Sequence, residues 1–212
     1  MGLEIVPRPS YDDDRELVAA CLRGDRVAER ALFRREYSRI NATVYRIVGA
    51  TRETDDLVQE TFIAVFRALP RFRHESKLST WIDRIAVRVV FHNLTARRRG
   101  NVPLESIAEP EDGGGSLDSR AQAREGLRRL YGALADLKPE ARMAFALYAI
   151  DGRSIAEVAS ITRTAQVTAK LRIWRARREL HRRIAGDAVL GDYVMQRGER
   201  WSGQRGEQRG QP

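Results

Sequence analysis

The stretch SIAEVASITRTAQVTAKLRIWRARRELHRRI, residues 154–184, decides the fold of the C-terminal half. Ser154 and Glu157 have the spacing of a capping box, in which a hydroxyl and a carboxylate each satisfy a backbone N–H at a helix start. The short helix that begins there should end at a break over residues 162–164, and a long basic helix should follow over residues 165–184. Two helices joined by so tight a turn predict a helix-turn-helix, whose second helix is the groove-reading element in DNA-binding proteins.

Residues 14–100 predict four further helices, because apolar residues recur at helical spacing and strand-like alternation does not persist. Gly24 should end the first helix, and Asp25 can cap a longer second helix that ends at Gly49. Thr54 is the predicted N-cap of the third helix. The fourth should start at residue 80. The side chains expected inside are Leu17, Val18, Cys21, Leu22, Ala28, Leu32, Ile40, Val44, Ile47, Val48, Val58, Phe62, Val65, Phe66, Leu69, Ile82, Ile85, Ala86 and Val89.

A second helical block is predicted from about residue 121. Pro139 suits the first position of a helix that runs to about residue 150, since its missing N–H would have no partner there. The inward positions expected in this block are Leu127, Leu130, Tyr131, Leu134, Leu137, Ala165, Ala169, Ile173, Ala176, Leu180 and Ile184. The predicted fold class is therefore all-α.

Composition divides the chain into two small helical domains with connecting and terminal segments. Residues 101–121 combine Pro, Gly, Ser and acidic residues, which predicts a flexible acidic linker between a domain at residues 14–100 and one at residues 122–185. Residues 1–13 form an N-terminal tail. Residues 186–212 are rich in Gly, Gln and Arg and predict a disordered tail.

The charge distribution favours a polyanion as partner. The net charge of the 212-residue chain is +9, and two basic blocks flank the acidic linker. Cys21 is the only cysteine, which excludes an internal disulfide or a thiolate metal cluster and fits a reducing cytoplasm. The longest apolar stretch, residues 143–150, is too short to span a membrane, so no membrane insertion is expected.

The sequence carries no signature of an enzyme. The three histidines, His74, His92 and His181, lack metal-ligand spacing, and we find neither a Gly-rich phosphate loop nor a nucleophile–base pair. No metal, no cofactor and no catalytic residue is therefore predicted.

Several motifs resemble those of the extracytoplasmic-function group of bacterial sigma factors. Region 2 of that group is matched by DDLVQETF at residues 55–62, FR at 66–67 and STWIDRIA at 79–86. Region 4 is matched by LKPE at residues 137–140, EVA at 157–159 and RARREL at 175–180. The resemblance covers about residues 14–185. It implies a subunit that directs core RNA polymerase to promoters by binding the −10 and −35 elements, with an anti-sigma factor as a further candidate partner.

The helix that bears DLVQE docks on the beta-prime clamp of core RNA polymerase in that group. Asp56, Gln59 and Glu60 stand at i, i+3 and i+4, so they share one face of the helix, opposite Phe62 and Phe66. The resemblance implies that these three polar residues bind the polymerase.

The loop at residues 71–79 and the helix after it resemble the reader of the −10 element. The residues implied in −10 DNA binding are His74, Ser76, Lys77, Trp81, Arg84, Arg88, Arg97, Arg98 and Arg99. Trp81 fits two roles, stacking on a base or packing in the core. Arg88 stands where members of the group usually carry Asn. The three consecutive arginines that end the helix suit phosphate binding.

The last helix resembles the reader of the −35 element. The residues implied are Gln166, Lys170, Leu171, Arg172, Trp174, Arg175 and Arg178. The turn before it lacks the glycine usual in the group, so Arg163 must hold a conformation that glycine tolerates better, or the turn differs. Val167, Leu171 and Trp174 form an apolar strip that suits packing, contacts to thymine methyls, or an anti-sigma partner.

Two other functions fit parts of the pattern. A stand-alone helix-turn-helix regulator would need the last two helices but no polymerase dock. A sigma-like protein-interaction module would retain the fold without reading DNA.

Overall fold

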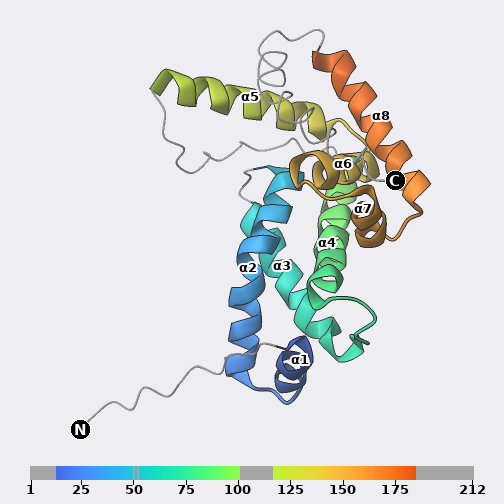
Figure 1. Cartoon of the computed structure of the whole chain (residues 1–212). Coiled ribbons are helices and arrows are strands. Elements are labelled where there is room, and N and C mark those ends of the chain that lie inside the picture. Colours follow the sequence, from blue (N-terminus) through green and yellow to red (C-terminus); the bar gives the residue numbers. More distant parts are fainter. Residues whose placement is uncertain (1–12, 50, 52, 101–116, 185–212) are drawn as a thin grey trace, which may run out of the picture.

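The computed structural model of the chain describes residues 13–49, 51, 53–100 and 117–184, and every regular element in these ranges is a helix. The elements are α1 (Asp14–Leu22), α2 (Arg26–Val48), α3 (Glu53–Ala68), η1 (Leu69–Arg71), α4 (Leu78–Gly100), α5 (Leu117–Ala135), α6 (Pro139–Phe145), η2 (Ala146–Ile150), α7 (Ile155–Thr162) and α8 (Gln166–Ile184). Helices α2, α3 and α4 stand side by side, with α1 at one end and α5 to α8 gathered at the other (Figure 1). The all-α prediction is confirmed.

Most helix ends lie where local chemistry predicts them. The Asp25 carboxylate caps α2 and accepts from the Val27 N–H at 2.7 Å, and Gly49 ends α2 with a φ of 84°. The prediction for Thr54 was wrong, because α3 begins at Glu53 and the Thr54 hydroxyl instead donates to the Gly49 carbonyl at 2.9 Å. Helix α4 begins at Leu78, before the predicted start.

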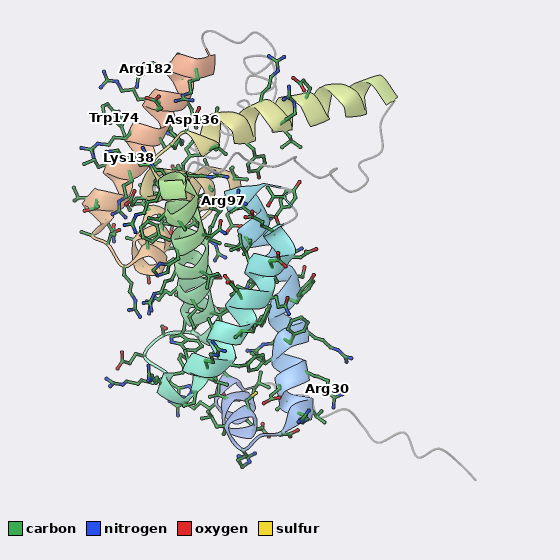
Figure 2. The ribbon with its side chains drawn as sticks, turned by 180° about the vertical axis from the view of Figure 1, so that it is seen from behind. Arg30, Arg97, Asp136, Lys138, Trp174 and Arg182 are labelled. Carbon is green, nitrogen blue, oxygen red and sulfur yellow. The ribbon has the colours of Figure 1, made fainter. Side chains whose placement is uncertain are left out.

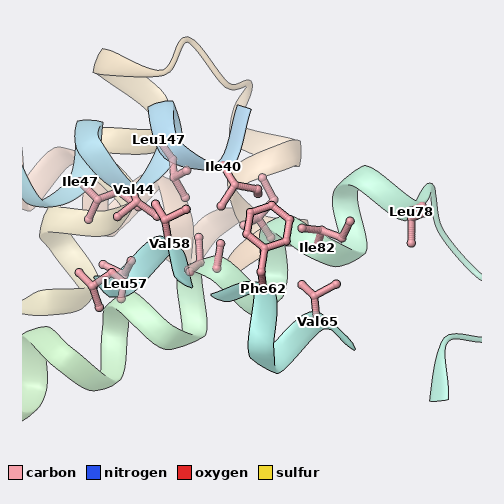
Figure 3. Packing of buried hydrophobic residues seen from close by; sticks show 14 of the residues in the cluster. Ile40, Val44, Ile47, Leu57, Val58, Phe62, Val65, Leu78, Ile82 and Leu147 are labelled. Carbon is pink, nitrogen blue, oxygen red and sulfur yellow. The ribbon is translucent and has the colours of Figure 1, made fainter. Parts of the chain in front are cut away.

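The core of the N-terminal half, α1 to α4, is made by the predicted inward faces. Leu32, Ile40, Val44, Val65 and Ile82 are all 0 % exposed. Figure 3 shows the last four of them in the core. The exception lies in α1, where Leu22, the last residue of the helix, is 51 % exposed. Phe66, Ile85 and Val89 are partly buried against the same core.

The C-terminal half, α5 to α8, has a smaller core of its own. It contains Tyr131, Ala133, Leu134, Leu137, Phe145, Ala176 and Leu180. Pro139 occupies the first turn of α6 as predicted, and a π-helical turn, η2, continues α6 to Ile150. Helix α5 begins at Leu117, so the last residues assigned to the linker are helical. Ala165 is exposed and not buried as predicted, because it precedes the first residue of α8.

The turn between α7 and α8 adopts the first of the two alternatives that the sequence left open, with Arg163 in a conformation that glycine tolerates better. Ser154 and Glu157 form a complete capping box at the start of α7. Arg163 ends α7 in the left-handed region, with φ 52° and ψ 49°, a conformation that costs a non-glycine residue about 1–2 kcal/mol. Thr162 and Thr164 bridge the turn through their hydroxyls at 3.1 Å.

The two halves are in direct contact, which the sequence did not predict. Leu147 and Val158 of the C-terminal half are 0 % exposed and belong to the same hydrophobic cluster as Val44 and Ile47 of the N-terminal half. The predictions for residues 1–12, 101–116 and 185–212, which are both tails and most of the linker, concern residues outside the described ranges. The side chain of Ile184 is also outside them.

Candidate polymerase and nucleic-acid interfaces

The exposed face of α3 carries the predicted polymerase residues together. Asp56, Gln59 and Glu60 are all exposed, while Phe62 on the opposite face is 4 % exposed and packs in the core. Among the described residues, none of the three polar side chains has a hydrogen-bond or ion-pair partner. The core therefore holds this face of α3 in place, and its polar side chains are available to another molecule.

A shallow groove that the sequence reasoning missed adjoins this face. It has a volume of about 420 Å³ and lies between α3 and α4, with Glu60, Ile63, Arg67, Arg71 and Val89 among its lining residues. Ile63 is 44 % exposed. Its position off the apolar stripe of α3 is the sequence signal that points to this groove.

The loop before α4 holds an aromatic cluster. The ring of Phe72 lies 4.5 Å from the His74 ring and 5.0 Å from the Trp81 ring. Trp81 also packs against the main core, which favours the packing interpretation over a base-stacking role. His74 has a positive φ of 56° and is exposed, as is Lys77, while Ser76 is partly exposed.

The predicted −10 arginines of α4 fall into two groups. Arg88, Arg98 and Arg99 are exposed. Arg84 instead donates to the backbone carbonyl of Ser160 in α7 at 3.1 Å and to its hydroxyl at 2.9 Å. Arg97 forms an ion pair with Glu53 of α3. Arg84 and Arg97 are therefore engaged within the chain, whereas Arg88, Arg98 and Arg99 are open to solvent.

The outer face of α8 brings the predicted −35 residues together. Gln166, Lys170, Leu171, Trp174, Arg175 and Arg178 are exposed, and Arg172 is partly buried. The apolar strip is also open to solvent, with Val167 79 %, Leu171 41 % and Trp174 53 % exposed, so much of its surface is available to another molecule. The Arg178 guanidinium lies over the Trp174 ring, 5.5 Å from its centroid, so cation and ring present one joint surface.

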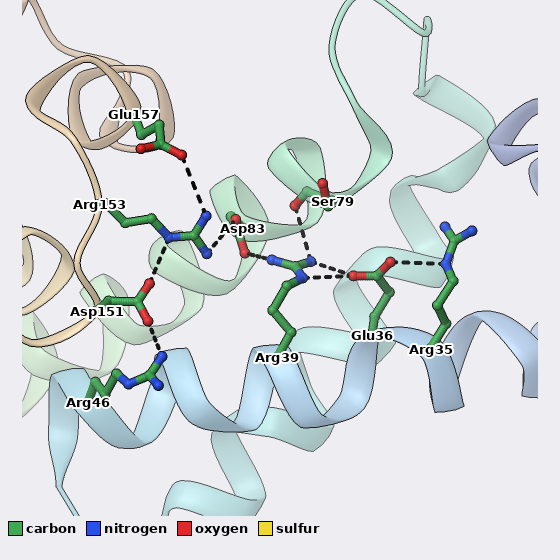
Figure 4. Close-up of polar contacts among 9 residues, drawn as sticks. All are labelled: Arg35, Glu36, Arg39, Arg46, Ser79, Asp83, Asp151, Arg153 and Glu157. Atoms are coloured by element: carbon green, nitrogen blue, oxygen red, sulfur yellow. Dashed lines mark hydrogen bonds and ion pairs between the residues drawn. The ribbon is translucent and has the colours of Figure 1, made fainter.

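A chain of alternating charges joins α2, α4 and the loop before α7, and sequence reasoning did not find it (Figure 4). Arg39 of α2 pairs with Asp83 of α4, and Arg153 lies 3.4 Å from Asp83 and 2.8 Å from Asp151. Asp151 pairs in turn with Arg46 of α2. Burial raises the pKa of Asp83, and the charges of Arg39 and Arg153 oppose that shift. The only sequence signal was Asp83 itself, an acid on an otherwise apolar helix face.

Metal clusters and membrane-spanning helices were sought in the described part of the chain. No cluster of His, Cys, Asp or Glu there could hold a metal ion, and no described helix is long and apolar enough to cross a membrane. Cys21 is buried, and burial raises the pKa of its thiol, so it is poorly suited to nucleophilic chemistry.

Comparison with known proteins identifies the family of the chain. Residues 32–100 match the family described as Sigma-70 region 2, and residues 127–180 match Sigma-70, region 4. An ECF RNA polymerase sigma-E factor of Salmonella typhimurium is 33 % identical over 180 residues, which cover 81 % of this chain and 94 % of that protein. The chain belongs to the extracytoplasmic-function sigma factors. It initiates transcription from specific promoters, as its region 2 and region 4 indicate.

Two further relatives support this sigma factor assignment. The RNA polymerase sigma-H factor of Pseudomonas aeruginosa is 29 % identical over 192 residues, covering 82 % of this chain and 95 % of that one. The solved structure of CnrH in complex with the cytosolic domain of CnrY superposes with a TM-score of 0.57 at 26 % identity, covering 82 % of this chain and 98 % of that chain. The resemblance read from the sequence motifs is confirmed, and the stand-alone regulator is set aside.

Proposed function

We propose that this sigma factor binds the beta-prime clamp of core RNA polymerase through Asp56, Gln59 and Glu60. The observation that carries the proposal is the α3 face itself, where three polar side chains on adjacent turns lack a partner among the described residues. Carboxylates can pair with cations on a partner, and the Gln59 amide adds directional hydrogen bonds. Because Phe62 anchors the back of α3 in the core, binding needs no rearrangement of this helix.

Region 2 then engages the −10 element through α4 and the loop before it. Arg88, Arg98 and Arg99 are exposed and suit the phosphates of the DNA backbone. His74, Ser76 and Lys77 lie on the preceding loop and suit a base that has left the duplex. Arg84 and Arg97 join this surface only if their contacts with Ser160 and Glu53 are released.

Region 4 reads the −35 element through α8. Lys170, Arg175 and Gln166 project from its first turns, where a recognition helix contacts base edges in the major groove. Arg172 and Arg178 supply further cations for phosphates. Leu171 and Trp174 add apolar surface suited to thymine methyl groups.

An anti-sigma factor is the second candidate partner for the apolar strip of α8. The specific observation is the exposure of Val167, which at 79 % is the most open large apolar side chain among the described residues. CnrH, a structural relative, was solved bound to the cytosolic domain of CnrY. A protein partner that covered this strip would also compete with DNA for α8.

The chain itself has no catalytic role in this proposal and needs no cofactor. It acts in the cytoplasm, because core RNA polymerase and the promoter are there. The test is transcription with purified core polymerase and the full-length chain on a library of random promoter sequences. We expect the chain to select templates that share two motifs, whereas core polymerase alone selects none. Failure of the chain to bind core polymerase or to select templates would contradict the proposal.

A further inference from the structure

The loop between η1 and α4, residues 72–77, has a backbone that depends on its surroundings. His74 has a φ of 56°, in the left-handed region, and such a conformation in a non-glycine residue persists only where the surrounding structure determines it. The ring centroids of Phe72, at the start of the loop, and Trp81, in α4, are 5.0 Å apart. The two ends of the loop therefore lie close together, and its shape depends on what fixes them.

The residue that should cap the start of α4 cannot do so. The Trp81 N–H donates to the Lys77 carbonyl at 3.1 Å, which places Lys77 at the position of the N-cap, directly before Leu78. A lysine side chain has three donors and no acceptor, so it cannot accept from the first N–H groups of the helix. These N–H groups need an acceptor from elsewhere.

Asp14 of α1 supplies such an acceptor. Its carboxylate oxygen Oδ2 accepts from the Leu78 N–H at 3.3 Å, although the two residues are 64 positions apart in the sequence. The positive end of the α4 dipole also favours a negative charge at this place. The other oxygen, Oδ1, accepts from the Arg35 guanidinium of α2 at 2.8 Å. One side chain of α1 therefore connects α2 to the first residue of α4.

The apolar face of α1 packs against the other end of the loop. Leu17 and Val18 are 1 % and 2 % exposed, and they share a hydrophobic cluster with Leu69 of η1 and with Phe72. Helix α1 contacts η1 directly, and the loop begins where η1 ends. Helix α1 thus contacts the loop at both ends, although it carries none of the predicted DNA-binding residues.

A second anchor for the start of α4 comes from α2. Arg39 donates to the backbone carbonyl of Ser79 at 3.2 Å (Figure 4). Glu36, which is 5 % exposed, accepts from Arg39 at 3.0 Å and from Arg35 at 3.1 Å. The first two residues of α4 are therefore bonded to α1 and α2. In this network the Asp14 side chain is 39 % exposed, so it can be changed without opening the core.

We propose that Asp14 is a positioning residue for −10 recognition, because its bond to Leu78 fixes the end of the loop at residues 72–77. The proposal rests on the proposed function, since it concerns the loop that is assigned there to an unpaired base. Asp14 itself does not contact DNA. Without its carboxylate the start of α4 is released, so His74 and Lys77 must be ordered when a base binds, which weakens binding. The polar face of α3 is unaffected.

The test measures two binding steps of the full-length Asp14→Ala variant. The holoenzyme formed with core polymerase is titrated with a single-stranded oligonucleotide that carries the −10 sequence selected with the wild-type chain. We expect this binding to weaken by about tenfold, in line with the loss of one helix cap. Affinity for core polymerase should stay within about twofold of the wild-type value, because the α3 face is unchanged. General destabilisation of the fold would not separate these two affinities.

Hydrogen exchange in the free chain gives a second readout that needs neither DNA nor polymerase. Asp14→Ala should speed exchange at residues 72–80 by about tenfold and leave α8 unchanged. Asp14→Asn should restore both the slow exchange and the −10 affinity, because its amide oxygen still accepts from Leu78 and Asn caps helices as well as Asp does. If circular dichroism shows that Asp14→Ala has lost helicity, Asp14→Ser replaces it, because its hydroxyl is too short to reach Leu78.

Two control variants separate positioning from a general loss of stability. Asp25→Ala removes the corresponding cap from α2, where the carboxylate accepts from the Val27 N–H at 2.7 Å. Asp136→Ala removes an exposed carboxylate that lies at the end of the molecule opposite α1 (Figure 2). Both variants should keep the wild-type affinity for the −10 oligonucleotide and the wild-type exchange at residues 72–80.

Wild-type affinity for the −10 oligonucleotide in the Asp14→Ala holoenzyme would overturn the proposal. An equal loss in Asp25→Ala, or no restoration by Asp14→Asn, would overturn it as well. Failure of the proposed function looks different, because the wild-type holoenzyme would then select no −10 sequence, while exchange at residues 72–80 would still depend on Asp14.

Discussion

Helices α3 and α4 both carry region 2 motifs, but only α4 has its polar side chains bonded to the C-terminal half. The polar face of α3 is open, and Asp56, Gln59 and Glu60 have no hydrogen-bond or ion-pair partner among the described residues. On α4, Arg84 is held by Ser160 from the C-terminal half, and Asp83 beneath it is enclosed in the charge chain. The difference teaches that a motif identifies a surface, whereas the packing of a distant segment decides whether that surface is available.

The largest expected effect tests whether the halves share one core. Leu147→Ala removes a fully buried side chain of the C-terminal half, so we expect a loss of about 2–5 kcal/mol in the free energy of unfolding. Thermal denaturation by calorimetry should show both halves destabilised together. Leu22→Ala is the matched control, because Leu22 is 51 % exposed and should cost less than about 0.5 kcal/mol. Independent unfolding of the N-terminal half at its original temperature would contradict the shared core.

Substitutions on the open face of α3 should weaken binding to core polymerase while leaving the stability of the fold almost unchanged. Reversing charge with Asp56→Arg and Glu60→Arg should weaken binding to core polymerase by about a hundredfold, since like charges then face the partner's cations. The free energy of unfolding should change by only a few tenths of a kcal/mol, because both residues are exposed. Asp136→Arg serves as the control in the same binding titration. Wild-type affinity in the double variant would remove α3 from the polymerase interface.

Substitutions on the outer face of α8 can distinguish DNA binding from binding of a protein partner. If Trp174 reads DNA, Trp174→Ala should cost about 1–3 kcal/mol on the selected −35 element, as Arg175→Ala should. Loss of phosphate contacts in Arg178→Ala should instead weaken all sequences alike and reduce the salt dependence of binding. Both are measured with the full-length chain by titration at several salt concentrations. Intact DNA binding in Trp174→Ala with loss of an inhibitor protein would assign the strip to that partner.

The smallest expected effect concerns the capping box of α7. The Ser154 backbone N–H and hydroxyl donate to the Glu157 carboxylate at 2.9 and 2.7 Å, which lowers the Glu157 pKa. A carboxyl group with a lowered pKa in the folded state stabilises above its unfolded pKa, about 4.3, and loses that contribution as the pH falls through the folded value. The melting temperature of the wild type should therefore exceed that of Glu157→Gln slightly at neutral pH. The difference should disappear in acid, and a constant difference would contradict this origin.

Local patterns predicted the helices and most of their ends. Several helix ends depend on backbone groups only a few residues away, so the local sequence is enough to predict them. They are the ends at Asp25, Gly49, Pro139 and the Ser154 capping box. Thr54 shows the limit of that reasoning, because its hydroxyl turned to the carbonyl of Gly49 and not to its own helix. A hydroxyl can donate to any acceptor within reach, and the folded backbone determines which acceptors those are.

The sequence by itself determined the family, the helical fold and the polar face of α3, because these depend on residue type and on spacing along a single helix. Only the tertiary structure decided that Arg84 is bonded to Ser160 while Arg88 is exposed. Arg84 and Ser160 are separated by 76 positions in the chain, and Arg142 reaches back 95 positions to Ile47. Side chains so far apart in the sequence meet only when burial of apolar surface brings their helices together. The spacing of residues within one helix does not predict that contact.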